Sequence, residues 1–223
     1  MAAEECVAAY SAASTERVES PKFRVISGPS NGLAQQIRSG ARADLFISAD
    51  SAWIDAVGDL SQSTSPLVSN RLVVAVPTKN RKQLDALNDL ANPDIERIAV
   101  AAPSVPIGNY AKQVIGHLTT EDRKSVENKL VFAKDSSALV AWLENGEVDV
   151  AIVYASDVSR SDRIRVAVDI DQGLHTPIVY SIAKLKSAGD LQSQSSEDFY
   201  QWLGSEEAVA IFEKAGFGRV PQN

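Results

Sequence analysis

The chain has 223 residues, of which 44% are hydrophobic and 23% are charged, and its formal net charge is −7. This composition is ordinary for a soluble globular protein, and the length suffices for one large domain or two small ones with a real core. The negative charge argues against nucleic acid or an anionic membrane as a partner, but small anions stay open because local dipoles decide such sites.

The N-terminal quarter predicts two helices and two strands. The expected elements are a helix over 3–14, a strand over 23–27, a helix that starts near Leu33 and ends at Gly40, and a buried strand over 43–48. The turn Gly28–Gly32 precedes the second helix, and Ser30 or Asn31 occupies its N-cap position. A serine-rich turn before a helix presents N–H groups and a hydroxyl, which favours binding of an anion.

The rest of the chain predicts strands that alternate with helices. A polar loop is expected over 58–68, strands over 71–77, 98–102, 130–133, 148–154, 165–170 and 176–183, and helices over 84–90, 109–118, 121–128 (or a turn), 138–144 and 197–215 (one helix or a pair). Ser136 and Ser137 are expected to cap the helix over 138–144, and Asn145–Gly146 to end it. The strand over 71–77 is a near-continuous apolar run of the kind that a parallel sheet buries on both faces. The alternation predicts an α/β protein with a parallel sheet.

Three turns share one construction, in which a buried strand leads through small residues into the start of a helix. They contain Ser30, the pair Ile107–Gly108 and the pair Ser136–Ser137. Strand-end loops of a parallel sheet share one edge, so N–H donors from these turns can converge on one anion.

Catalytic and metal chemistry find little support in the sequence. His117 and His175 have no neighbours at metal-ligand spacing, and we expect both at the surface. No Ser-His-Asp or Cys-His combination is visible, so we expect no enzyme activity, no cofactor and no metal site. Asp44, Asp50 and Asp135 lie at strand ends, where each is interpreted as capping or orienting a helix.

The stretch from residue 27 to residue 50, SGPSNGLAQQIRSGARADLFISAD, strongly resembles the periplasmic molybdate-binding proteins of oxyanion ABC transporters. At this place the family has a small-residue turn with a ligand-binding serine, then LAxQI, then GAxADxFISAD. The residues that fit are Ser30, Leu33, Gln36, Ile37, Gly40, Ala43, Asp44, Phe46, Ile47, Ser48, Ala49 and Asp50. The resemblance runs from about residue 4 to residue 217 and includes the closing EEAVAIFEKAGFG.

This resemblance implies a two-lobed α/β fold of the periplasmic-binding-protein kind (type II), with the ligand in a cleft between lobes that two crossover strands join. By the same resemblance, lobe 1 comprises 1–72 and 181–223, and lobe 2 comprises 73–180. The final helix is expected to pack back on lobe 1.

Similarity to the family also implies four ligand-binding residues. Ser30 matches a serine that donates its hydroxyl and its backbone N–H. Ile107, in the loop VPIGNYA, and Ser136 match backbone N–H donors. Tyr154 matches a tyrosine whose hydroxyl completes the cage. The implied ligand is molybdate or tungstate, a tetrahedral dianion held by neutral donors, with molybdenum bound only as the oxyanion.

The family function is capture of the oxyanion by lobe closure and delivery to the permease of an ABC importer. The resemblance implies a monomer in the periplasm or cell envelope, with no nucleic-acid partner. Residues 1–19 nevertheless lack the basic start and apolar core of a signal peptide. A cytoplasmic module that senses an oxyanion or another small ligand on the same fold is therefore the alternative.

One feature of the family has no counterpart here. Its members have a strand before the first helix, and that strand ends in a turn with a second anion-binding serine. Either the true start lies upstream, or the chain is a shortened homologue with impaired binding. We favour a shortened start.

Overall fold

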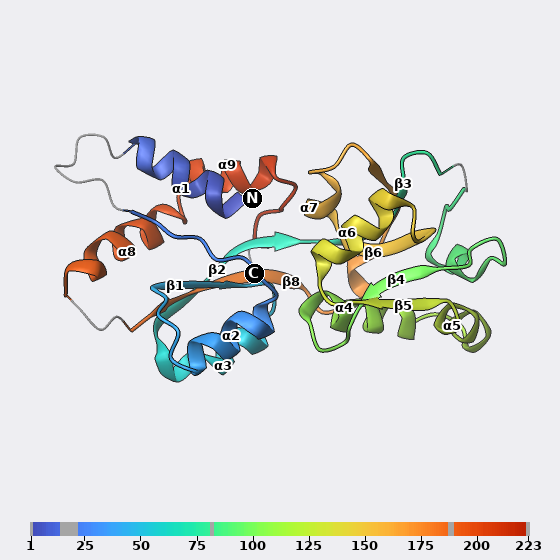
Figure 1. Cartoon of the computed structure of the whole chain (residues 1–223), viewed down its shortest axis with the longest axis horizontal. Helices are drawn as coiled ribbons and strands as arrows, with labels where there is room; N and C mark the ends of the chain where they lie inside the picture. Colours follow the sequence, from blue (N-terminus) through green and yellow to red (C-terminus); the bar gives the residue numbers. More distant parts are fainter. Residues whose placement is uncertain (1, 14–21, 81–82, 187–189, 222–223) are drawn as a thin grey trace. The chain divides into compact units, whose positions relative to one another are not determined.

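The computed structural model describes residues 2–13, 22–80, 83–186 and 190–221, and it divides into two compact units (Figure 1). Unit 1 comprises residues 1–69 and 179–223, and unit 2 comprises residues 70–178. Each unit has its own sheet with helices packed against it. The predicted α/β class is confirmed.

Unit 1 is built on a three-stranded sheet in the order β1-β8-β2. Strand β1 pairs antiparallel with β8, with Leu45 opposite Lys184 and Ser48 opposite Ser181. The elements are α1 (Ala2–Ala13), α2 (Ser30–Arg38), β1 (Leu45–Ser48), α3 (Ser51–Ala56), η1 (Gly58–Leu60), β2 (Ser61–Asn70), β8 (Ile178–Leu185), α8 (Asp190–Trp202) and α9 (Glu206–Lys214). No described helix is both long enough and apolar enough to cross a bilayer.

The core of unit 1 has two parts, because successive strand residues point to opposite faces of the sheet. Ile182 packs with buried residues of α1, α8 and α9, among them Tyr10 and Phe212. The next residue of β8, Ala183, belongs to a separate cluster with Phe46 and with buried residues of α2 and α3. The closing helix α9 thus packs against α1 within unit 1.

Unit 2 contains a five-stranded sheet in the order β5-β4-β6-β3-β7. Its elements are β3 (Leu72–Pro77), η2 (Leu87–Ala91), β4 (Ile98–Ala101), α4 (Pro106–Gly116), α5 (Thr120–Glu127), β5 (Leu130–Ala133), α6 (Ser136–Asn145), β6 (Val150–Tyr154), α7 (Ala155–Val158), β7 (Ile164–Asp169) and η3 (Gln172–Leu174). Every residue of β4 and β6 is buried, as is typical of central strands covered on both faces.

The sheet of unit 2 is mixed, which corrects one prediction. Strands β4, β5 and β6 run parallel, but β3 pairs antiparallel with both β6 and β7. The apolar run 71–77 is buried as expected, but burial on both faces does not by itself specify strand direction.

Two predicted elements near the N-terminus are wrong. Residues 23–27 form no strand, because no described strand pairs with them, and Ile26 is 55% exposed. The expected loop over 58–68 is instead mostly strand β2. Its serine-rich sequence has low strand propensity, but pairing with β8 supplies the hydrogen bonds that decide strand formation.

Helix ends show smaller differences. Helix α2 begins at Ser30 with Pro29 as its N-cap, so neither Ser30 nor Asn31 caps it. The helix expected over 84–90 is the short 3-10 helix η2. Gly146 ends α6 with φ of 71°, a left-handed conformation that glycine adopts without strain, and this matches the prediction.

The thiol of Cys6 is expected to be unreactive in the folded protein. Cys6 is fully buried, and burial, with a smaller contribution from Glu5, raises its pKa to about 11. Because the thiolate is the reactive form, a disulfide reagent at mildly alkaline pH should leave the native thiol unmodified and react with one thiol per chain in concentrated guanidinium chloride. Rapid labelling of the native protein would contradict the packing of α1 in unit 1.

Candidate functional site

Two helices and one buried tyrosine lie at the same edge of the unit 2 sheet. In the parallel strands, Ile98 of β4 is opposite both Leu130 of β5 and Val150 of β6, so the carboxyl ends of the three strands share that edge. Helix α4 follows β4, helix α6 follows β5, and Tyr154 is the last residue of β6 (Figure 1). This arrangement brings together the predicted site residues of unit 2.

Ile107 lies in the first turn of α4. The first bond along this helix runs from the N–H of Asn109 to the carbonyl of Val105, at 3.1 Å, so the N–H groups of Ile107 and Gly108 precede the intrahelical ladder. Gly108 is required by close approach, because a Cβ there would lie 2.1 Å from the carbonyl oxygen of Ala102. The helix start therefore sits directly on the end of β4.

Ser136 is the first residue of α6. The N-cap is Asp135, whose Oδ1 accepts a hydrogen bond from the N–H of Ala138 at 2.9 Å. The expected capping by serines is therefore wrong, while the interpretation of Asp135 as a cap is confirmed. Because Asp135 satisfies only one N–H, the other N–H groups of the first turn, including that of Ser136, have no acceptor inside the helix.

Tyr154 is buried, and Asp157 of the short helix α7 that follows it pairs with Arg160, just beyond that helix, which the sequence analysis did not predict. Asp157 is only 6% exposed, and its Oδ1 accepts a hydrogen bond from Nη2 of Arg160 at 2.5 Å. Burial raises the pKa of the Asp157 carboxyl, and Arg160 opposes that rise through its charge and its hydrogen bond. The Ser136 hydroxyl and the backbone of Tyr154 lie close enough to oppose it further. The i,i+3 spacing of opposite charges was the available signal.

Ser30 belongs to unit 1, where it joins two segments. It is the first residue of α2, and its Oγ accepts a hydrogen bond from the N–H of Ala49, just after β1, at 3.2 Å. The hydroxyl hydrogen is thus left to donate elsewhere. Asp50 caps α3 through a bond from the N–H of Ala52 to Oδ1 at 2.9 Å, which confirms its predicted capping role.

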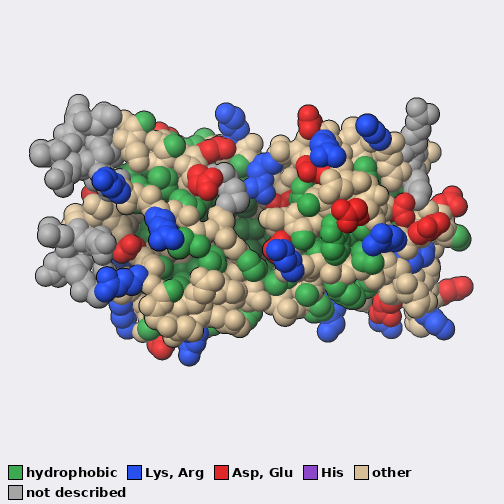
Figure 2. All heavy atoms as spheres, in the orientation of Figure 1, with side chains coloured by type: hydrophobic (Ala, Val, Ile, Leu, Met, Phe, Trp, Pro, Cys, Tyr) green, Lys and Arg blue, Asp and Glu red, His purple; other side chains and the backbone are tan. Residues whose placement is uncertain are grey.

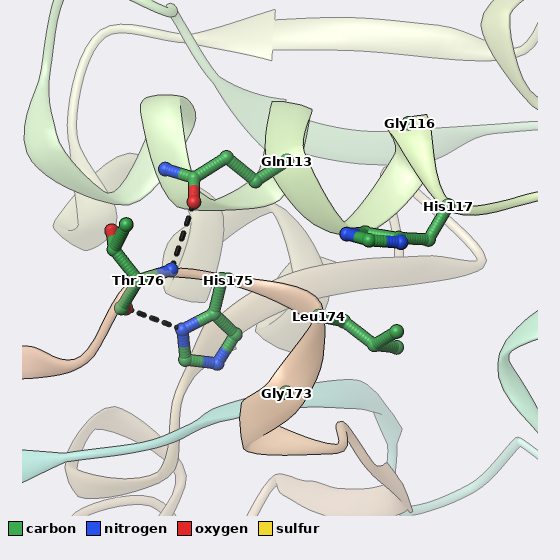
Figure 3. Close-up of a pocket in the computed structure, with 7 residues that line it drawn as sticks. All are labelled: Gln113, Gly116, His117, Gly173, Leu174, His175 and Thr176. Carbon is green, nitrogen blue, oxygen red and sulfur yellow. Dashed lines mark hydrogen bonds between the residues drawn. The ribbon is translucent and has the colours of Figure 1, made fainter.

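The expectation that His175 lies at the surface is wrong. His175 is 8% exposed, and its Nδ1 lies 2.8 Å from the carbonyl oxygen of Thr176. Its Nε2 is buried and has no hydrogen-bond partner in the part of the chain that the structure describes. Figure 3 shows Gln113 reaching from α4 to the backbone N–H of Thr176, at 2.8 Å. A hollow of about 520 Å³ lies here, and His117, which is exposed as expected, also lines it. None of the four predicted site residues lines this hollow.

No metal-binding cluster is found among the described residues, and the face drawn in Figure 2 shows no large patch of one charge sign. Among the described residues, no group of three or more His, Cys, Asp or Glu side chains is placed to hold a metal ion. On the face shown in Figure 2, lysine and arginine side chains are interspersed with aspartate and glutamate. The candidate site is therefore characterised by local hydrogen-bond donors and not by the electrostatic potential of a charged surface patch.

A family model described as bacterial extracellular solute-binding protein matches residues 1–218. A Bacillus subtilis protein, named provisionally as an ABC transporter substrate-binding lipoprotein, is 34% identical over 195 residues, which are 85% of this chain and 73% of that protein. The molybdate-binding protein ModA of Escherichia coli is 32% identical over 197 residues, 84% of this chain and 75% of ModA. These relatives confirm the resemblance predicted from residues 27–50.

Solved structures agree on the fold. The periplasmic molybdate-binding protein of Azotobacter vinelandii superimposes with a TM-score of 0.84 over 99% of this chain and 95% of that protein, at 21% identity. The predicted two-lobed periplasmic-binding-protein fold is confirmed by this likeness. At this level of identity the likeness concerns the fold alone.

Gly108→Ala is expected to destabilise the protein, because the new Cβ would collide with the carbonyl oxygens of Ala101 and Ala102. We expect a loss of about 1–3 kcal/mol in the free energy of unfolding, measured by denaturant titration. Gly116→Ala is the matched control in the same helix, since nothing lies within 4 Å of its added Cβ. Equal stability of the two variants would contradict the seating of α4 on β4.

Proposed function

Because this chain belongs to the family of bacterial extracellular solute-binding proteins, we propose that it binds molybdate or tungstate and delivers the oxyanion to the permease of an ABC importer. The observation that carries the ligand class is the edge of the unit 2 sheet, where the starts of α4 and α6 lie beside the end of β6. Helix starts carry partial positive charge and N–H groups that no helical carbonyl satisfies, so they suit an anion.

The donors of this edge are neutral, and this suits a tetrahedral dianion. A hydrogen bond to a charged partner contributes about 1.5–3 kcal/mol, roughly twice the contribution of a neutral one, so several such bonds can replace a counter-charge. Donors held on strand and helix ends are also fixed in position. We propose that they select molybdate and tungstate by size over sulfate.

Four residues are proposed to bind the oxyanion. In unit 1, Ser30 donates its hydroxyl hydrogen, which the bond accepted from Ala49 leaves available. In unit 2, Ile107 and Ser136 donate their backbone N–H groups from the first turns of their helices. Tyr154 donates its phenolic hydroxyl.

The family is one of binding proteins, and we assign no reaction to this chain. We extend the proposal to its setting: a monomer in the periplasm or cell envelope, with an ABC permease as its protein partner and without nucleic acid. The names of the relatives support this setting, since one is a lipoprotein of an ABC transporter and another is a molybdate-binding protein.

Isothermal titration of the 223-residue protein is expected to show binding of molybdate and tungstate with a stoichiometry of one. Sulfate and phosphate at the same concentrations should give no heat, because the proposed selection by size excludes these smaller anions. Binding of sulfate or phosphate alone would reassign the ligand. Absence of heat with all four anions would count against the oxyanion site.

Tyr154→Phe is expected to weaken molybdate binding by about tenfold to a hundredfold, because it removes one hydrogen bond to a charged ligand. Tyr10→Phe is the matched control, since Tyr10 is a similarly buried tyrosine in the core of unit 1. Titration of both variants gives the affinities, and thermal unfolding gives their stabilities. If both variants bind like the unchanged protein, the proposed role of the Tyr154 hydroxyl is wrong.

A further inference from the structure

A small network of buried polar side chains surrounds helix α7. Ser156 and Asp157 are 2% and 6% exposed, and Asn70, the first residue of unit 2, is 8% exposed. The side-chain amide of Asn70 donates to Oγ of Ser156 at 2.8 Å, and Nε of Arg160 donates to the carbonyl oxygen of Ser156 at 3.1 Å. Arg160 also binds Oδ1 of Asp157. One arginine thus joins the backbone of α7 to its buried carboxylate.

The Asp157 carboxylate lies next to the proposed donors of unit 2. Helices α6 and α7 pack together (Figure 1), and Asp157 and Arg160 line a hollow of about 270 Å³ together with Ser137, the neighbour of Ser136. Oδ2 of Asp157 is buried and has no hydrogen bond of ordinary geometry among the described residues, although the Ser136 hydroxyl lies close to this carboxylate. The negative charge of this buried carboxylate therefore lies close to the site at which a dianion is proposed to bind.

An uncompensated carboxylate at this position would lower the affinity for an anion through electrostatic repulsion. Two negative charges repel most strongly where protein, and not water, lies between them, because the effective dielectric constant is low there. A buried carboxylate is tolerated in proteins when it is paired. Arg160, whose side chain is 40% exposed, supplies this pairing from the surface.

We propose that Arg160, acting through Asp157, sets the affinity of the oxyanion site: its guanidinium cancels the charge of a buried carboxylate that would otherwise repel the bound dianion. Arg160 then affects the ligand only through the charge of Asp157 and does not contact the ligand itself. This inference rests on the proposed function, because it requires an anion at the unit 2 edge.

Other charged groups lie on the elements packed against α7: Asp135 caps α6 by accepting the N–H of Ala138, Arg165 of β7 donates to backbone carbonyl oxygens, and two ion pairs account for four more. Glu144 of α6 lines the same hollow and lies 3.9 Å from Nη1 of Arg163, which precedes β7. Arg71, just before β3, pairs with Asp169 at the end of β7. Loss of Arg160 would therefore leave Asp157 as the new uncompensated charge beside the donors.

The central test is Arg160→Ala in the whole chain, titrated with molybdate. We expect the affinity to fall about tenfold at the alkaline end of the range in which the unchanged protein binds. The loss should shrink towards the acidic end, because an unpaired buried carboxyl has a raised pKa and becomes neutral as the pH falls. A purely structural role would give a loss that does not depend on pH.

The double variant Arg160→Ala/Asp157→Asn separates action through Asp157 from direct attraction of the anion by Arg160. We expect it to regain most of the affinity and to lose the added pH dependence. If the double variant binds as weakly as Arg160→Ala, the inference is overturned, because the arginine then acts by itself. Unchanged affinity of Arg160→Ala at every pH would overturn it as well.

Two further variants complete the design. Arg160→Lys keeps a positive charge and is expected to bind within about twofold of the unchanged protein. Arg163→Ala removes a neighbouring arginine whose partner is Glu144, and it should leave both the affinity and its pH dependence unchanged. Thermal unfolding of each variant identifies any loss due to misfolding. Failure of the unchanged protein to bind any oxyanion would reject the proposed function itself, whereas binding without the expected pattern would reject only this inference.

Discussion

Parallel pairing of β4, β5 and β6 is the constraint on which the rest of unit 2 depends. Parallel strands need a crossover between them, and each crossover here contains a helix that starts at the same edge of the sheet. The topology therefore places the starts of α4 and α6 and the end of β6 at one edge of the sheet. A cluster of N–H groups that could bind an anion is a consequence of this topology.

Because backbone segments pack closely at this edge, the topology has a defined geometry. The first turn of α4 lies so near the end of β4 that position 108 has no room for a Cβ. At α6, the carboxylate of Asp135 satisfies one N–H and leaves others of the first turn without a helical acceptor. Backbone donors held in this way lose little entropy when a ligand arrives, which is the advantage of a preorganised site.

Side chains of opposite charge are paired around the same edge. Asp157 is buried, and its pairing with Arg160 offsets the charge of that carboxylate. The network continues through Ser156 to Asn70, the residue at which the chain enters unit 2. In a low-dielectric environment, a network of this kind is stable only when its charges are matched.

The sequence by itself determined the local features. Apolar runs predicted β4 and β6, Gly146 predicted the end of α6, and residues 27–50 identified the family. Only the tertiary structure decided that 58–68 forms mostly strand while 23–27 does not, that β3 runs antiparallel, and that His175 is buried. Propensity and periodicity act over a few neighbouring residues, whereas strand pairing and the burial of a polar side chain depend on partners distant in the chain. The Asp157–Arg160 pair depends on local and on tertiary features. The spacing of the two residues can be read from the sequence, whereas the burial of Asp157 depends on the tertiary structure.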